Sequence, residues 1–192
     1  MNEYSLLKYI YRPCVSRISH LIAPTQMSPI QLSLIAFGIS IISAWLFSSE
    51  YYAGLFFGAL LAFLSLCMHL VAEEIRRLRH LPIEAFQKAD KALVFYSELF
   101  FIAGLAAHIA ITDPKILCLL LGLLAATGIL LLDKFKERSA KPFWTYFNFI
   151  EHPSMRISLM IFFALINLPI LAIFIIALGS NGLVFAGLLD KK

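Results

Sequence analysis

Charged side chains are scarce in this chain. Asp, Glu, Lys and Arg make up only 15% of its 192 residues, whereas 60% of the residues are hydrophobic. So little polar surface cannot cover a water-soluble globule, and this excludes a soluble protein. The net charge is +4, but no soluble basic module carries interleaved base-stacking aromatic residues. The sequence therefore predicts no nucleic-acid partner.

Cysteine is also rare, and the three residues Cys14, Cys67 and Cys118 lie far apart. An odd, scattered set gives neither a disulfide framework nor the paired spacing of a metal site. A cleavable signal peptide is not expected. The first long apolar run begins at Pro29, has the length of a membrane span and lacks a clear small-residue cleavage site. No internal repeat stands out, so residues 1–192 are expected to form a single membrane domain.

Long apolar runs are what the sequence has in abundance. About 20 apolar residues are enough for a helix to cross the hydrocarbon layer. The run over residues 157–189 is too long for one crossing, and it is interrupted at Asn167–Pro169, where proline should break the helix. Six membrane spans are therefore predicted, at about residues 29–48, 51–72, 92–111, 116–132, 154–167 and 168–189.

The placement of basic residues supports this count. With six crossings, all of the 16 Lys and Arg residues except Lys115 fall on one side of the membrane. Basic residues concentrate in cytoplasmic loops, so both termini are predicted to be cytoplasmic. With five crossings, Lys191 and Lys192 would lie outside and the asymmetry would be lost.

Residues 1–28 are predicted to form an amphipathic segment at the membrane surface. Apolar residues recur there at helical spacing, and Lys8, Arg12 and Arg17 lie among them. Such a helix places its apolar side in the bilayer and its cations near lipid phosphates. Ser28 followed by Pro29 is a typical helix start.

Polar residues gather where the second and third predicted spans meet the cytoplasm. One face of the second helix carries four of them at i, i+4, i+7 and i+8, namely His69, Glu73, Arg76 and Arg77. Pro82 is expected to end this helix, and Asp90 is expected to open the next one. This geometry permits one cytoplasm-facing cleft lined by both helices.

The spacing of these residues resembles the signature of the CDP-alcohol phosphatidyltransferases, D-x2-D-G-x2-A-R-x8-G-x3-D-x3-D. Residues 69–94 fit this spacing without a gap, with Arg77 at the arginine position and Asp90 at the third aspartate. Residues 11–13 and 24–29 before the first span resemble the same family, as does the broken last pair of spans. The likeness covers essentially the whole chain.

The resemblance implies six transmembrane helices preceded by an amphipathic interfacial helix, with the site at the cytoplasmic side. Members of this family act in phospholipid biosynthesis. They transfer a phosphatidyl or phospho-alcohol group from a CDP-activated donor to an alcohol and release CMP. Four aspartates hold two divalent metals, usually Mg²⁺ or Mn²⁺, and the last can act as base. The resemblance also implies the bacterial inner (plasma) membrane, lipid and CDP-linked partners, and a homodimer as one option.

The chain departs from this signature at most positions. In signature order, the residues that stand in place of the expected ones are His69, Ala72, Glu73, Arg76, Phe86 and Val94. One carboxylate, Asp90, cannot hold two Mg²⁺ ions, which prefer oxygen ligands. His69 offers nitrogen, which suits zinc-like metals better. Val94 cannot accept a proton.

Specific candidates follow from these positions. The candidate metal ligands are Asp90, His69 and Glu73. The candidate phosphate-binding residues are Arg77, Arg76 and Arg79. The arginines could instead only set the topology or contact anionic lipid. Glu98 is a candidate general base, about 6 Å beyond Val94 along the helix axis. The alternative is a buried hydrogen bond from Glu98 to a neighbouring helix.

Three hypotheses about function remain. The first is a catalytically impaired relative that keeps the fold and binds lipid, a nucleotide headgroup or a membrane partner. The second is a working transferase with a metal site rebuilt on His69, Glu73 and Asp90. The third is a transporter or a generic scaffold. Transporters gather polar residues near the bilayer midplane, whereas here they gather at the cytoplasmic edge, which counts against the third.

Overall fold

The computed structural model describes residues 5–81, 83–112, 116–136 and 152–189. Within these ranges every regular element is an α-helix and none is a strand, as the composition predicts. The helices are α1 (Ser5–Ile22), α2 (Pro29–Phe47), α3 (Tyr52–Leu78), α4 (Ile83–Thr112), α5 (Ile116–Lys136), α7 (Pro153–Leu165) and α8 (Pro169–Leu189).

The chain is a membrane protein by the length and composition of its helices. Among the described residues, α2, α3 and the part of α4 from Lys88 to Thr112 are long and apolar enough to cross a bilayer. Shorter apolar stretches lie in α5, α7 and α8. Large side chains such as Trp45 and Phe185 point outward, with 73% and 67% of their surface exposed. Apolar exposure of this kind suits contact with lipid.

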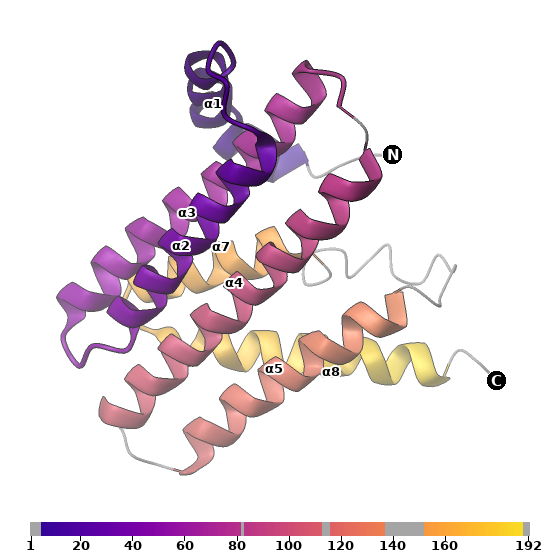
Figure 1. Cartoon of the computed structure of the whole chain (residues 1–192). Helices are drawn as coiled ribbons and strands as arrows, with labels where there is room; N and C mark the ends of the chain where they lie inside the picture. Colours follow the sequence, from indigo (N-terminus) through magenta and orange to yellow (C-terminus); the bar gives the residue numbers. More distant parts are fainter. Residues whose placement is uncertain (1–4, 82, 113–115, 137–151, 190–192) are drawn as a thin grey trace.

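Helix α2 lies between α3 and α4 and packs along both, whereas α3 and α4 touch each other little. Figure 1 shows these three helices side by side, with α7 and α8 crossing behind them. Serine hydroxyls form hydrogen bonds between α2 and α3. Ser43 donates to the Gly58 carbonyl at 2.7 Å, and Ser65 donates to the Ala36 carbonyl at 2.8 Å. Small residues of this kind let membrane helices approach closely.

Two helices end on a residue in the left-handed region. His80, after α3, has φ 49°, and Asn167, after α7, has φ 59°. In each case the next residue donates its N–H to a carbonyl five residues earlier, as in the Leu168 to Phe163 hydrogen bond of 2.8 Å. The break predicted at Asn167–Pro169 is therefore a tight turn, and Pro169 opens α8.

The expected boundary between α3 and α4 is corrected by the structure. Helix α3 ends at Leu78, ahead of Pro82, which lies outside the described residues. Helix α4 begins at Ile83, so Asp90 lies about two turns inside it rather than at its start. The reason is that good helix formers, with alanine, glutamate, glutamine and lysine, fill the intervening positions.

Helix α1 forms within the segment that was predicted to lie at the membrane surface, and it continues through Pro13. Figure 1 places it at one end of the bundle. Tyr11 is buried, stacks on Phe63 of α3 and shares a hydrogen bond of 2.9 Å with the Ser158 hydroxyl of α7. Burial raises the pKa of the Tyr11 phenol above its usual value. The helix is therefore docked on the bundle by specific side chains.

Gly104→Ala should lower the stability of the α2–α4 contact. A Cβ at Gly104 would lie 2.4 Å from the backbone carbonyl oxygen of Ala44, so one helix would have to shift. We expect a loss of about 1–3 kcal/mol in the free energy of unfolding in micelles. Gly38→Ala is the matched control, because nothing lies within 4 Å of its Cβ position. Equal effects of the two changes would contradict the close contact.

Candidate functional site

Three helices meet at one carboxylate. Asp90 of α4 accepts a hydrogen bond at its Oδ1 from the Ser33 hydroxyl of α2, at 2.6 Å. His69 of α3 places its Nδ1 3.0 Å from the same oxygen. His69 is buried and Asp90 is partly buried, with 5% and 14% of their side-chain surfaces exposed. The structure thus brings two of the three predicted metal ligands into direct contact and adds Ser33, which sequence reasoning missed.

The two ring nitrogens of His69 have different surroundings. A carboxylate only accepts hydrogen bonds, so Nδ1 carries the hydrogen in the contact with Asp90. Nε2 is buried and, within the described residues, has no hydrogen-bond partner. Asp90 therefore holds the ring in one orientation with Nε2 turned to the other side. An ordered carboxylate–histidine pair of this kind can present one nitrogen to a ligand.

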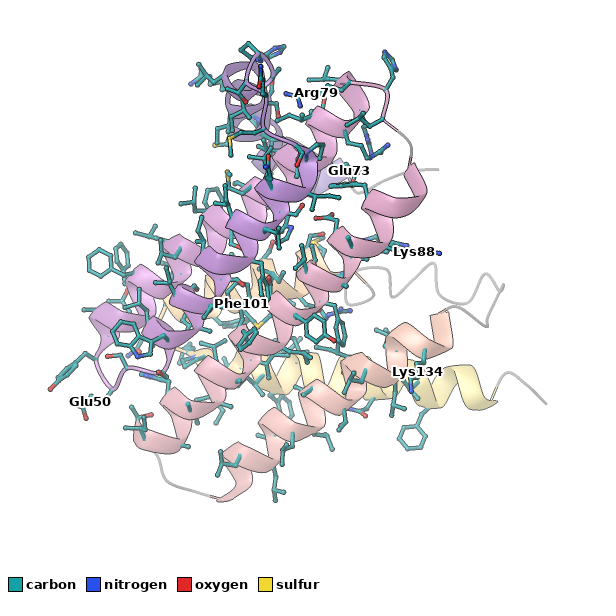
Figure 2. The ribbon with its side chains drawn as sticks, viewed as in Figure 1. Glu50, Glu73, Arg79, Lys88, Phe101 and Lys134 are labelled. Carbon is teal, nitrogen blue, oxygen red and sulfur yellow. The ribbon has the colours of Figure 1, made fainter. Side chains whose placement is uncertain are left out.

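Glu73, the third predicted metal ligand, pairs with arginines on its own helix. Its carboxylate lies 2.8 Å from Arg77 Nη2 and 3.7 Å from Arg76 Nη2. Arg76 has only 11% of its side-chain surface exposed, and its guanidinium lies 5.9 Å from the centre of the Phe86 ring on α4. Contacts from Arg76 therefore reach both Glu73 and Phe86 at the end of the bundle where α3 ends and α4 begins. Figure 2 labels Glu73 at that end.

Arg79 contacts the backbone of the α1–α2 connection. Its guanidinium donates hydrogen bonds to the carbonyls of Met27 at 2.8 Å, Ala23 at 3.1 Å and Thr25 at 2.5 Å. Figure 2 shows Arg79 beside α1 at the same end of the molecule as Glu73. Its donors hold the connection onto the end of α3. The predicted role of Arg79 in phosphate binding stays a prediction.

Glu98, the candidate general base, lies in a buried ion pair. Arg156 of α7 donates from Nη2 to Oε2 of Glu98 at 2.7 Å and from Nε to Oε1. Both side chains are at least 95% buried. The guanidinium therefore covers both carboxylate oxygens, which makes Glu98 a poor proton acceptor for a substrate. The sequence analysis counted Arg156 among the cytoplasmic cations. Its position at the start of an apolar run was the signal that could have indicated a buried partner.

The donor set does not fit the two Mg²⁺ or Mn²⁺ ions that the resemblance implies. Such ions need several oxygen ligands each. The contact between α2, α3 and α4 offers one carboxylate, one hydroxyl and one imidazole, and Glu73 is directed to arginines. Among the described residues, no group of three His, Cys, Asp or Glu side chains is placed to hold a metal ion.

The fold of this chain is similar to that of a known membrane enzyme. No protein-family model and no curated protein sequence matches the chain. Among the solved structures that match is a phosphatidylinositol phosphate synthase from Mycobacterium tuberculosis, crystallised with CDP-DAG bound. The TM-score is 0.76 at 13% sequence identity, and the match covers 92% of this chain and 92% of that chain. At this identity the likeness establishes a shared fold.

The hydrogen bonds at Asp90 should be coupled. Asp90→Ala removes the acceptor of both Ser33 and His69 and should lower the free energy of unfolding by about 1–3 kcal/mol. Ser33→Ala should cost less, and its effect should largely disappear in the Asp90→Ala background. Unfolding of the two single variants and the double variant in micelles measures this coupling. Additive losses would show that the Ser33–Asp90 contact contributes nothing to stability.

Proposed function

We propose that this chain is a non-catalytic member of the CDP-alcohol phosphatidyltransferase family that remains in the membrane as a lipid-contacting protein. Two lines support descent from that family. The fold is shared with a synthase that was crystallised with CDP-DAG bound. Residues 69–94 keep the signature spacing on the helices that would form the site, with Arg77 on α3 and Asp90 on α4.

The same proposal includes the membrane topology. Six crossings by α2, α3, α4, α5, α7 and α8 leave α1 at the surface and both termini in the cytoplasm. The cytoplasmic face is then the end of the bundle at which α3 ends and α4 begins. The inner (plasma) membrane of a bacterium is the location that the family resemblance suggests.

One observation carries the loss of catalysis. Asp90 is the one carboxylate at the four aspartate positions of the signature, and its Oδ1 is already bonded to Ser33 and faces His69 at 3.0 Å. These contacts occupy Oδ1 with hydrogen-bond partners from the protein itself. Phosphoryl transfer depends on positioned cations that neutralise charge on the phosphates, so a site without the ligands for them loses its main source of acceleration.

The replacements at the small positions of the signature support the same conclusion. Glu73 and Phe86 stand where the family has glycine, and Arg76 stands where it has alanine. In the structure Arg76 joins the other two, through the 3.7 Å contact with Glu73 and the stacking on Phe86. Space that small residues would leave beside the helices is thus filled by interacting side chains of the protein.

Exposed cations on α3 and α4 suit a lipid surface. Arg77 has 52% of its side-chain surface exposed, and Lys88 and Lys91 on α4 are exposed as well. Clustered cations at a membrane face attract the phosphates of anionic lipids. Anionic phospholipid, rather than a CDP-linked donor, is therefore the proposed ligand of this face.

A working transferase with a rebuilt site is the second candidate, and one observation favours it. His69 Nε2 is buried without a hydrogen-bond partner among the described residues, beside the aligned Asp90. A nitrogen held in this way is a fit ligand for a zinc-like metal or a fit proton acceptor. The enzymatic test must therefore include Zn²⁺.

Purified protein should not release CMP from CDP-diacylglycerol above the level of a protein-free control. The mixture should contain candidate alcohols and Mg²⁺, Mn²⁺ or Zn²⁺, and CMP should be followed by chromatography. The expected result is the same for the wild type and Asp90→Ala, because one carboxylate cannot hold the metals. Metal-dependent release that Asp90→Ala abolishes would establish the second candidate instead.

A variant with aspartates restored serves as the control for metal binding. His69→Asp, Ala72→Asp and Val94→Asp together rebuild the four-carboxylate set with Asp90. The restored variant should bind Mn²⁺ at least about tenfold more tightly than the wild type, measured by the Mn²⁺ paramagnetic signal. Equal binding by the two proteins would contradict the proposed loss of the metal site.

Anionic lipid should remain bound to the purified protein through the exposed cations. The double variant Arg77→Ala/Lys88→Ala should retain fewer phosphatidylglycerol molecules than the wild type in native mass spectrometry, because each cation near lipid phosphate contributes about 1 kcal/mol. Arg77→Lys/Lys88→Arg keeps both positive charges at the same positions and serves as the matched control. Equal lipid retention by all three proteins would argue against this binding face.

A further inference from the structure

The buried pair Glu98–Arg156 is outside the candidate site and joins two helices that lie far apart in the sequence. Glu98 on α4 has no exposed surface and Arg156 on α7 has 5% of its side chain exposed. The guanidinium meets both carboxylate oxygens, one of them at 2.7 Å. Arg156 also lies in the first turn of α7, where the helix dipole disfavours a cation. Helix formation alone therefore does not explain an arginine at this position.

The depth of the pair in the bilayer is set by α4. The apolar span of α4 starts at about Ala92, and Glu98 lies six residues further on, which is about 9 Å along the helix axis. Ionisable side chains at such depth are costly unless they face the protein interior and meet a partner. Each member of this pair removes that cost for the other.

Helix α7 is short for a membrane span. Its 13 residues from Pro153 to Leu165 extend about 20 Å, whereas the hydrocarbon layer is about 30 Å thick. The missing length, about 10 Å, equals the depth of Glu98 below the start of the span. Helix α7 can therefore begin at the level of Glu98 and still reach the far side of the bilayer. Arg156, in its first turn, is then required to lie inside the hydrocarbon layer.

We infer that Glu98 is an intramembrane counter-ion that brings the short α7 into the bilayer. Helix α4 precedes α7 in the chain, so its carboxylate is in place in the membrane when Arg156 arrives. The pair then fixes the depth of α7 and keeps the Asn167 turn on the outer face. This inference rests on the proposed crossing of α7 and α8 and is independent of any catalytic role.

Labelling of the turn from outside the cell tests the inference. A single cysteine is introduced as Leu168→Cys, at a residue with 44% of its surface exposed, after the three native cysteines have been replaced by serine or alanine. Intact cells that express the full chain are treated with a membrane-impermeant maleimide. The labelled fraction should be high with Glu98 and Arg156 intact. No labelling of this protein would overturn the six-crossing topology and the inference together.

Variants of the pair then separate the counter-ion role from simple packing. Glu98→Leu should lower the labelled fraction about tenfold, because Arg156 loses its buried carboxylate and draws α7 toward the cytoplasmic surface. Arg156→Leu and the double variant Glu98→Leu/Arg156→Leu should label like the parent, because α7 then carries no charge into the bilayer. The exchanged pair Glu98→Arg/Arg156→Glu should restore labelling.

The asymmetry between the two single changes is the decisive result. Packing alone would make Glu98→Leu and Arg156→Leu equally harmful, and equal loss would overturn the inference. Full labelling of Glu98→Leu would also overturn it. Ser97→Ala is the local control, since it removes the neighbouring 2.9 Å contact with Ser40 and should leave labelling unchanged. Because labelling is read in whole membranes, variants that are unstable in detergent still give a result.

Discussion

The bundle depends on a single carboxylate oxygen that connects three helices. Asp90 Oδ1 is reached from α2 by Ser33 and from α3 by His69. Helices α3 and α4 otherwise contact each other little, so this junction and the Arg76–Phe86 contact join the end of α3 to the first turns of α4. In a metal-dependent relative, carboxylates at these positions would repel each other until cations arrived. Here the charge is balanced by hydrogen-bond donors of the protein.

Much of the fold could be predicted from the sequence because membrane helices are encoded locally. Each apolar run that was read as a span lies in a helix, and proline and asparagine mark the turn between α7 and α8. The start of α4 was misplaced, since the polar residues before Asp90 gave no apolar signal although they form helix well. Apolar periodicity identifies the part of a helix that meets lipid. It does not indicate how far the helix continues into water.

The candidate site was predictable only in part, because its partners come from different helices. The signature spacing identified Asp90 and His69, and the structure brings them to 3.0 Å. The partners of Ser33 and Arg156, which are Asp90 and Glu98, lie on another helix and are visible only in the structure. Glu73 shows the opposite case. Its predicted role as a metal ligand stays a prediction, and in the structure its carboxylate pairs with arginines one turn away on its own helix.

The docking of α1 has a consequence for how a helix at the proposed membrane surface would respond to the lipid. Tyr11 fixes one part of this surface helix to α3 and α7, and Arg79 fixes the connection after it to the end of α3. A change in bilayer thickness or curvature acts first on a helix lying in the interface. In the proposed topology, a tilt of α1 would strain the hydrogen bonds of Arg79 to the connection and, through them, the turn of α3 that carries Arg76 and Arg77.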